Sequence, residues 1–308
     1  MSILSEIKSR YADYRLNKIN KMETSVSTGE MGIESSTRSP PKIMPDKLKI
    51  TLKTLPKQLS IAKNMEHTVK SLRYNPENPE TTLTDGFKEE FEGYASSIGI
   101  DKVAYTQVPA EFIFQDRKLT YENAIILVME MDKKAIDNAP SSQTQEMGVM
   151  TYDELGKATN HLTDFLRENG VAAQASHPAG GFVVYPALAQ KAGLGWKGRH
   201  GMLITPEFGP RQRISAIFTS INNLPDNGSN SHSWVSSFCE KCGKCIKACP
   251  GNAITEESDA SSIKRTVILK EFCHGCTICM KECSFNKRGY NQIKTKSQQF
   301  NSRQFNSK

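Results

Sequence analysis

No cysteine lies outside residues 239–283 of this 308-residue chain, and no apolar run approaches the ~20 residues that a membrane-spanning helix needs. The first 30 residues contain neither an apolar signal core nor a twin-arginine pair. The chain is also much longer than the small secreted domains that depend on disulfide frameworks. We therefore expect a protein without a transmembrane segment that stays in the cytoplasm, where thiols remain reduced.

Acidic residues are absent from residues 284–308, a segment that carries six Lys and Arg residues. The first 80 residues also carry a basic excess, so the net charge of +7 is concentrated at the two ends of the chain. A folded nucleic-acid surface usually mixes aromatic residues with its basic residues. The C-terminal segment is instead rich in Asn, Gln, Ser and Lys, which is typical of a solvated tail. We expect such a tail, and an arm that contacts RNA is the alternative.

All eight cysteines fall into two runs with the same spacing, C-x2-C-x2-C-x3-C. Three closely spaced thiolates can hold one face of an iron–sulfur cube, and the fourth leads away toward a second cube. A structural zinc site would use two separated pairs without a central third cysteine. The sequence therefore predicts two [4Fe-4S] clusters whose fourth ligands are exchanged, as in bacterial two-cluster ferredoxins. The expected ligand sets are Cys239, Cys242, Cys245 and Cys283 for one cluster and Cys273, Cys276, Cys279 and Cys249 for the other.

Pro250 follows Cys249, as the bacterial pattern requires, whereas Ser284 follows Cys283 and departs from it. A cluster segment of about 50 residues leaves most of the chain to form a larger body. Residues 124–131 are a continuous apolar run, which is typical of a strand covered on both faces. Helices are predicted over 85–99, 152–169 and 186–192, and strands over 101–108, 124–131, 171–175, 182–185, 202–205 and 214–219. This alternation predicts an α/β or α+β core.

The first 80 residues are expected to form an irregular basic extension. It would contain a short helix over 3–22, a linker rich in Ser, Thr, Gly and Pro over 24–45, and a helix over 46–72 that is broken at Pro56. The predicted domains are this extension over 1–80, the α/β core over 81–235, a two-cluster ferredoxin-like domain over 236–286 and a polar basic tail over 287–308.

Four glycines lie within nine residues in the stretch G-L-G-W-K-G-R-H-G, namely Gly193, Gly195, Gly198 and Gly201. Such a stretch lets the backbone approach a flat or bulky ligand, and a tight structural turn is the alternative. Its G-x-G-x-x-G pattern follows a helix rather than a strand and has no acid downstream. Neither a dinucleotide fingerprint nor a phosphate-binding loop is therefore predicted.

The longer run A-G-L-G-W-K-G-R-H-G-M-L-I-T-P-E-F-G-P-R, over residues 192–211, precedes the two cysteine runs. This combination resembles the corrinoid-dependent reductive dehalogenases. It is also similar to the epoxyqueuosine reductases, which share A-Q-K-A-G-L-G-W with residues 189–196. The resemblance covers about residues 87–283. It implies a nitroreductase-like α/β core that binds a base-off cobalamin, and a bacterial ferredoxin-like domain whose two [4Fe-4S] clusters supply electrons.

The same resemblance implies functional residues. Tyr152 matches the family's proton-donating tyrosine, and Arg199 matches the basic residue of its glycine motif. A phenol can protonate a developing carbanion, and a fixed guanidinium favours the phenolate. The alternatives are an exposed tyrosine, an arginine paired with a surface carboxylate and, for His177, a loop histidine bonded to the backbone. The expected corrinoid contacts are His177, Gly193, Gly195, Trp196, Gly198, His200, Gly201, Leu203, Thr205 and Pro206.

The leading functional hypothesis is a cobalamin- and iron–sulfur-dependent reductase that cleaves a carbon–halogen or carbon–oxygen bond through Co(I). It implies a small-molecule substrate and an electron donor such as a ferredoxin or flavodoxin, and no RNA partner is expected. Ala179 occupies the position where epoxyqueuosine reductases carry a catalytic acid. The alternatives are an electron-transfer or maturation protein without substrate turnover of its own, and an enzyme like the tRNA epoxyqueuosine reductases.

Overall fold

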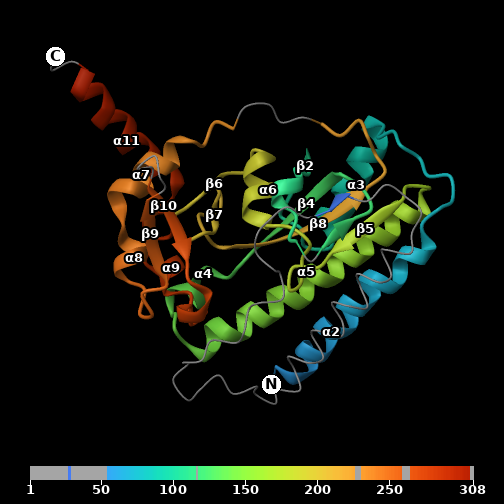
Figure 1. Ribbon diagram of the computed structural model, residues 1–308, viewed down its shortest axis with the longest axis horizontal. Helices are drawn as coiled ribbons and strands as arrows, with labels where there is room; N and C mark the ends of the chain where they lie inside the picture. Colours follow the sequence, from blue (N-terminus) through green and yellow to red (C-terminus); the bar gives the residue numbers. More distant parts are fainter. Residues whose placement is uncertain (1–26, 29–53, 116, 226–229, 259–263, 306–308) are drawn as a thin grey trace.

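A four-stranded antiparallel sheet lies at the centre of the computed structural model, which describes residues 27–28, 54–115, 117–225, 230–258 and 264–305 (Figure 1). In the middle of the sheet, Ile125 pairs with Tyr105 on one side and with Ile217 on the other. The strands, in their order across the sheet, are β2 (Lys102–Gln107), β4 (Asn123–Glu130), β8 (Gln212–Thr219) and β5 (Ala173–Ser176).

The side chains of β4 alternate between two hydrophobic layers, because successive residues of a strand point to opposite faces. Ile126 and Val128 belong to the layer that contains α6 (Tyr185–Lys191). Ile125 and Leu127 belong to the layer that contains the helices α3 (Asp85–Ser97) and α5 (Ser142–Glu168). Since both faces are covered, six consecutive residues of β4 are buried. The prediction of a doubly covered strand is confirmed.

Helix α5 crosses the molecule beneath the sheet, and α2 (Leu55–Lys70) runs along it (Figure 1). The hydroxyl of Ser141 caps α5 by accepting the backbone N–H of Thr144. The helix therefore starts well before Tyr152, the predicted start, because the cap rather than the apolar stripe sets its beginning. Pro56 lies in the first turn of α2, where proline is tolerated. The predicted break at Pro56 is thus a helix start.

Short elements make up the part of the chain that carries the cysteines. Tyr290 and Ile293 are buried against Phe285, so the beginning of the segment predicted as a solvated tail is packed. The antiparallel pair β9–β10 was not predicted, because its residues are largely charged or hydroxylated. The elements are α7 (Trp234–Cys242), α8 (Lys244–Lys247), β9 (Ile254–Ser258), β10 (Lys264–Ile268), α9 (Ile278–Lys281), α10 (Ser284–Arg288) and α11 (Tyr290–Phe305).

A buried polar network joins this part to the sheet. Arg211 Nη2 forms an ion pair with Glu130 Oε1 at 2.8 Å, and Arg211 Nη1 donates to Asn286 Oδ1 at 3.0 Å. Asn286 Nδ2 in turn donates to Asp137 Oδ1 at 2.9 Å. Because Arg211 and Asn286 are both buried, their hydrogen bonds fix α10 against the beginning of β8.

The remaining elements are short. Residues 182–185, predicted as a strand, contain only an isolated bridge from Val183 to Ile113. The predicted helix over 3–22 lies outside the described residues, as does the predicted linker except for β1. Within the described ranges, every helix is too short or too polar to cross a lipid bilayer. The other elements are β1 (Ser27–Thr28), η2 (Ser71–Tyr74), η3 (Ala110–Phe112), β3 (Lys118–Leu119), α4 (Lys133–Asp137), β6 (Trp196–Lys197), β7 (Leu203–Ile204) and η4 (Lys270–Phe272).

Two helical glycines offer a test of the packing between α5 and β5. A Cβ at Gly156 would lie 2.0 Å from Nε2 of the buried His177 ring, whereas a Cβ at Gly93 in α3 would have no neighbour within 4 Å. We expect Gly156→Ala to destabilise the protein by roughly 1–3 kcal/mol through overpacking. Gly93→Ala should stabilise it by about 0.5–1 kcal/mol through helix propensity. Thermal unfolding followed by circular dichroism checks both signs, and a stabilising Gly156→Ala would contradict the packing.

Candidate iron–sulfur centre and active site

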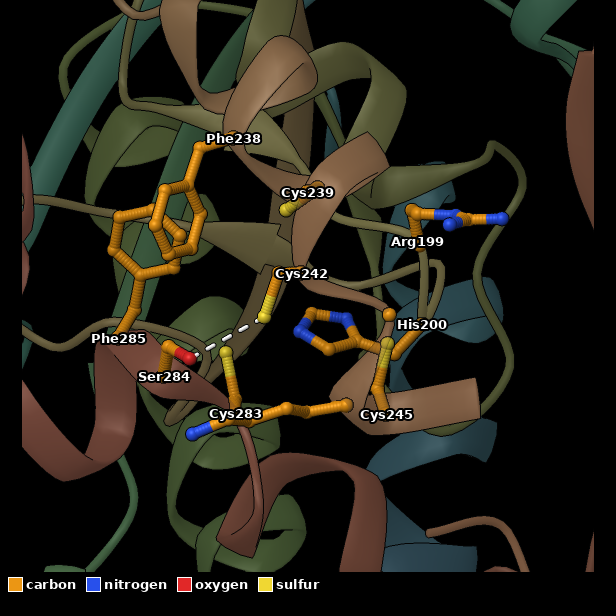
Figure 2. Close-up of a pocket in the computed structure, with 11 residues that line it drawn as sticks. Arg199, His200, Phe238, Cys239, Cys242, Cys245, Cys283, Ser284 and Phe285 are labelled. Carbon is orange, nitrogen blue, oxygen red and sulfur yellow. Dashed lines mark hydrogen bonds between the residues drawn. The ribbon is translucent and has the colours of Figure 1, made fainter. Parts of the chain in front are cut away.

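Four of the eight cysteines line one pocket, whose wall also contains Arg199 and His200 (Figure 2). Cys239 and Cys242 lie in the last turns of α7, Cys245 lies in α8, and Cys283 directly precedes α10. Cys283 comes from the second cysteine run, so the pocket combines three thiols of the first run with one of the second. In the described part of the chain, no three His, Cys, Asp or Glu side chains are arranged to hold a single metal ion.

The other four cysteines form a second group. Burial raises the pKa of both Cys276 and Cys279, and neighbouring thiols add to the effect. These neighbours are Cys249 and Cys273 for Cys276, and Cys276, Cys273 and Cys245 for Cys279. Cys249, from the first run, therefore lies near Cys276 of the second run. These two groups are the sets that the spacing predicts, and their role as iron ligands stays a prediction.

Burial opposes negative charge on these thiols. It raises the pKa of Cys239 and Cys283 to about 12 in each case. Backbone N–H groups act in the opposite direction, since Arg199 donates to Cys239 and Phe285 and Asn286 donate to Cys283. Such N–H donors are the usual surroundings of cluster thiolates, and cationic iron would supply the rest of the compensation.

Ser284 adds a hydroxyl to the first group. Its Oγ lies 3.3 Å from Cys242 Sγ, and the residue is almost completely buried. The serine that departs from the ferredoxin pattern therefore contacts a thiol of the first group. In the second group, the backbone N–H of Ala253 donates to Cys249 Sγ at 3.3 Å.

The tip of a small hairpin forms one wall of the pocket that the first cysteine group lines. β6 pairs with β7 in antiparallel fashion, and the connecting residues 198–202 bring Arg199 and His200 to the pocket wall. A Cβ at Gly195 would lie 2.1 Å from Ile204 O, and a Cβ at Gly198 would lie 2.8 Å from His200 Cε1. These glycines thus permit close packing within the hairpin. The alternative of a structural turn accounts for them.

The other expected corrinoid contacts have protein partners. His177 is buried, and its Nδ1 accepts the backbone N–H of Ala179 at 3.0 Å. Thr205 Oγ1 lies 3.3 Å from Gln212 Oε1 and also accepts the N–H of Phe208. Leu203 is buried in the layer around α6. The members of the set that keep exposed surface are Gly193, Trp196, Gly201 and Pro206.

Arg199 does not supply the guanidinium beside Tyr152. Its side chain forms an ion pair with Glu256 and donates to Thr266 Oγ1 at 3.2 Å, which corresponds to the surface-carboxylate alternative. Instead, the guanidinium carbon of Arg213 lies 4.4 Å from the centroid of the Tyr152 ring. The expected pairing is therefore corrected to Tyr152 with Arg213.

Sequence reasoning missed Arg213, although a signal was present. Arg213 is the one charged residue of β8, whose other residues are polar or apolar and mostly buried. Its Nε is buried and has no hydrogen-bond partner among the described residues. A charged side chain in a buried strand is costly unless it has a function or a partner. Only the packing of β8 against α5 shows that Arg213 reaches Tyr152.

Comparison with known proteins agrees with this geometry. A family model described as "4Fe-4S dicluster domain" matches residues 238–287. These residues are a 4Fe-4S dicluster domain. A tetrachloroethene reductive dehalogenase from Desulfitobacterium hafniense is 30% identical over 188 residues, which are 54% of this chain and 33% of that protein. An epoxyqueuosine reductase from Listeria monocytogenes is 29% identical over 116 residues, which are 33% of this chain and 29% of that protein.

The chain is thus similar to proteins of these two groups of reductases, and the match spans about one third of the length of that dehalogenase. Among solved structures, the catabolic reductive dehalogenase NpRdhA in complex with 3-bromo-4-hydroxybenzoic acid is similar with a TM-score of 0.59 and 17% identity. The match covers 80% of this chain and 38% of NpRdhA. The mixed helix and strand fold with a ferredoxin-like cluster domain, expected from the sequence, is confirmed.

Paired substitutions distinguish exchanged from unexchanged cluster ligands. Cys239→Ala with Cys283→Ala removes two thiols of one group, so one [4Fe-4S] cluster with an unchanged spectrum and about four irons should remain. Cys273→Ala with Cys283→Ala removes one thiol from each group and should leave no cluster with an unchanged spectrum. Iron analysis and electron paramagnetic resonance after anaerobic reconstitution measure both. The reverse outcome for the two pairs would mean that each run holds its own cluster.

Proposed function

We propose that the chain is an iron–sulfur reductase that delivers electrons from two [4Fe-4S] clusters to a reductive bond cleavage beside Tyr152 and Arg213. One observation carries the proposal. Met147 of α5 and Met202 of the hairpin pack on the apolar cluster that contains Met280, which lies between Cys279 and Cys283. The helix that carries Tyr152 and the cysteine-bearing part therefore pack on the same apolar cluster, which would place the electron source on the side of the proposed proton donor.

The cysteine groups fit iron–sulfur clusters in three respects. They offer eight thiols in two sets of four, N–H and O–H groups aimed at the sulfurs, and a buried His200 Nε2 without a partner among the described residues. Each of these features is explained by a bound cluster, since cluster sulfurs accept hydrogen bonds. One electron from each cluster would supply the pair that a reductive cleavage consumes. An external one-electron donor, such as a ferredoxin or flavodoxin, would refill them.

The reductase is proposed to use a cobalamin, because a reductive dehalogenase with this fold is described as "B12-dependent". When bound, the cobalamin supplies the low-valent cobalt that engages a carbon–halogen or carbon–oxygen bond. The residues around Tyr152 fit such a cofactor in one respect. Arg213 Nε has no hydrogen-bond partner among the described residues, so it could donate to a polar group of the cofactor. Trp196 and Pro206 keep exposed surface and would contact the cofactor.

Tyr152 and Arg213 would complete the chemistry. Cleavage of a carbon–halogen bond takes two electrons and one proton, and it releases a halide and a carbon–hydrogen product. The Tyr152 hydroxyl supplies the proton to carbon, and the Arg213 guanidinium over its ring stabilises the phenolate that remains. Tyr152 is half-buried, so it can reach a substrate without being fully exposed to water.

A tRNA substrate is the second candidate, because epoxyqueuosine reductases are among the relatives. Helix α11 projects from the body and contains Lys294, Lys296 and Arg303 without an acidic residue (Figure 1). Salt-dependent binding of an anticodon stem-loop that Lys294→Glu with Lys296→Glu weakens would favour this candidate. Unchanged binding in that variant would exclude α11 as the RNA contact.

Anaerobic reconstitution with iron, sulfide and cobalamin tests the cofactor content. We expect about eight irons and one cobalt per desalted chain. Eight irons without retained cobalt would contradict the cobalamin proposal and favour an electron-transfer protein. Fewer than about four irons would contradict the two-cluster assignment itself.

A pair of matched tyrosine substitutions tests the catalytic role. Tyr152→Phe should lower reductive turnover by about 10²–10⁴-fold, because it removes the proton donor, while iron and cobalt contents stay unchanged. Tyr74→Phe is the control, since Arg73 also lies over the Tyr74 ring, at 4.7 Å, but Tyr74 is exposed. Reduced methyl viologen as the electron donor, with tetrachloroethene or 3-bromo-4-hydroxybenzoic acid as probe, gives the rates. Equal rates in the two variants would contradict the assignment.

A further inference from the structure

His200 is directed into the pocket of the first cysteine group. Its imidazole lies among Cys242, Cys245 and Cys283 (Figure 2), and all of these residues line the same pocket. The ring is almost completely buried, and its Nε2 has no hydrogen-bond partner among the described residues. A buried polar nitrogen has lost its hydrogen bonds to water, so one without a protein partner calls for an acceptor from a bound group or water.

The proton on the ring can be placed from the hydrogen bond on its other side. His200 Nδ1 accepts the backbone N–H of Met202, at 3.2 Å, and therefore carries no proton itself. In a neutral imidazole the proton must then lie on Nε2. The nitrogen that faces the cysteines is thus an N–H donor. It requires an acceptor in the pocket.

The hairpin holds the ring in this orientation. Gly198 leaves room for it, because a Cβ there would lie 2.8 Å from His200 Cε1 and 3.2 Å from Nε2. The tight turn over residues 198–202 closes with the N–H of Gly201 bonded to the carbonyl of Gly198. Turning the ring over would break the hydrogen bond from the N–H of Met202 to Nδ1.

We propose that His200 Nε2–H donates a hydrogen bond to a sulfur atom of the [4Fe-4S] cluster held by Cys239, Cys242, Cys245 and Cys283, and so raises the reduction potential of that cluster. Reduction adds negative charge to a cluster, and an N–H dipole directed at its sulfur stabilises the added charge. The first cluster is then reduced at a higher potential than it would be without this hydrogen bond.

This inference rests on the cluster half of the proposed function and needs neither the cobalamin nor a substrate. His200 was expected to contact a corrinoid, and the structure places its ring against the cysteines instead. The backbone N–H of Arg199 and the Ser284 hydroxyl contact thiols of the same group, so His200 would add a further hydrogen-bond donor to this cluster. His200 is a positioning and tuning residue rather than a catalytic one.

Redox titration of the reconstituted protein, followed by electron paramagnetic resonance, tests the proposal. In His200→Phe we expect the ratio of reduced to oxidised first cluster, at a fixed potential, to fall about tenfold, which equals ~59 mV for one electron. The second cluster should titrate as in the wild type. His200→Gln, which keeps a side-chain N–H donor, should restore part of the shift. Unchanged titration of both clusters in His200→Phe, with about eight irons retained, would overturn the proposal.

A measurement on the wild-type protein covers the case in which His200→Phe loses its cluster. Protein with ¹⁵N-labelled histidine is reduced and studied by pulsed electron paramagnetic resonance. We expect one weak nitrogen coupling, transmitted through the hydrogen bond, and an exchangeable proton coupled to the same cluster. No nitrogen coupling, or the strong coupling of a nitrogen bound directly to iron, would overturn the proposal. An iron content below about four would instead contradict the two-cluster assignment.

Discussion

The exchange of one cysteine between the two runs is the constraint on which the cysteine-bearing part depends. Cys283 closes the group formed by the first run, and Cys249 closes the group formed by the second. Neither group can therefore form unless both runs are folded together. The elements that carry them are very short, α8 and α9 among them, and isolated helices of this length are not stable in water. The packing of Phe285, Tyr290 and Ile293 and the Arg211–Asn286 hydrogen bond help to hold this part of the chain in place, and cluster binding would add to them.

Cys283 also connects the first cysteine group to the central sheet. Cys283 is followed by α10, whose Asn286 bonds to Arg211 at the beginning of β8. Arg213, two residues further along, reaches Tyr152 of α5. A single short path of chain and hydrogen bonds thus runs from a cluster thiol to the candidate proton donor. This path links the proposed electron source to the place where a bond would be cleaved.

The sequence was most informative where chemistry is local. Ligand spacing within each cysteine run is a property of a few consecutive residues, so it predicted the two groups and even their exchange. The apolar run of β4 was recognised for the same reason. Tertiary relationships were harder to predict. Arg199 lies within the glycine-rich stretch and Arg213 follows it, and only the tertiary contacts of the two side chains show which of them lies over Tyr152. Likewise, the glycines of that stretch could serve a ligand or a hairpin, and only the contacts of Gly195 and Gly198 distinguish the two.

Anaerobic crystals of the reconstituted protein, with diffraction data collected at the iron absorption edge, give the most direct test of this arrangement. The account predicts two iron peaks, each surrounded by three sulfurs of one cysteine run and one of the other, with His200 Nε2 within hydrogen-bonding distance of the cluster bound by Cys283. Two clusters that each take all four ligands from a single run, or one cluster only, would contradict it.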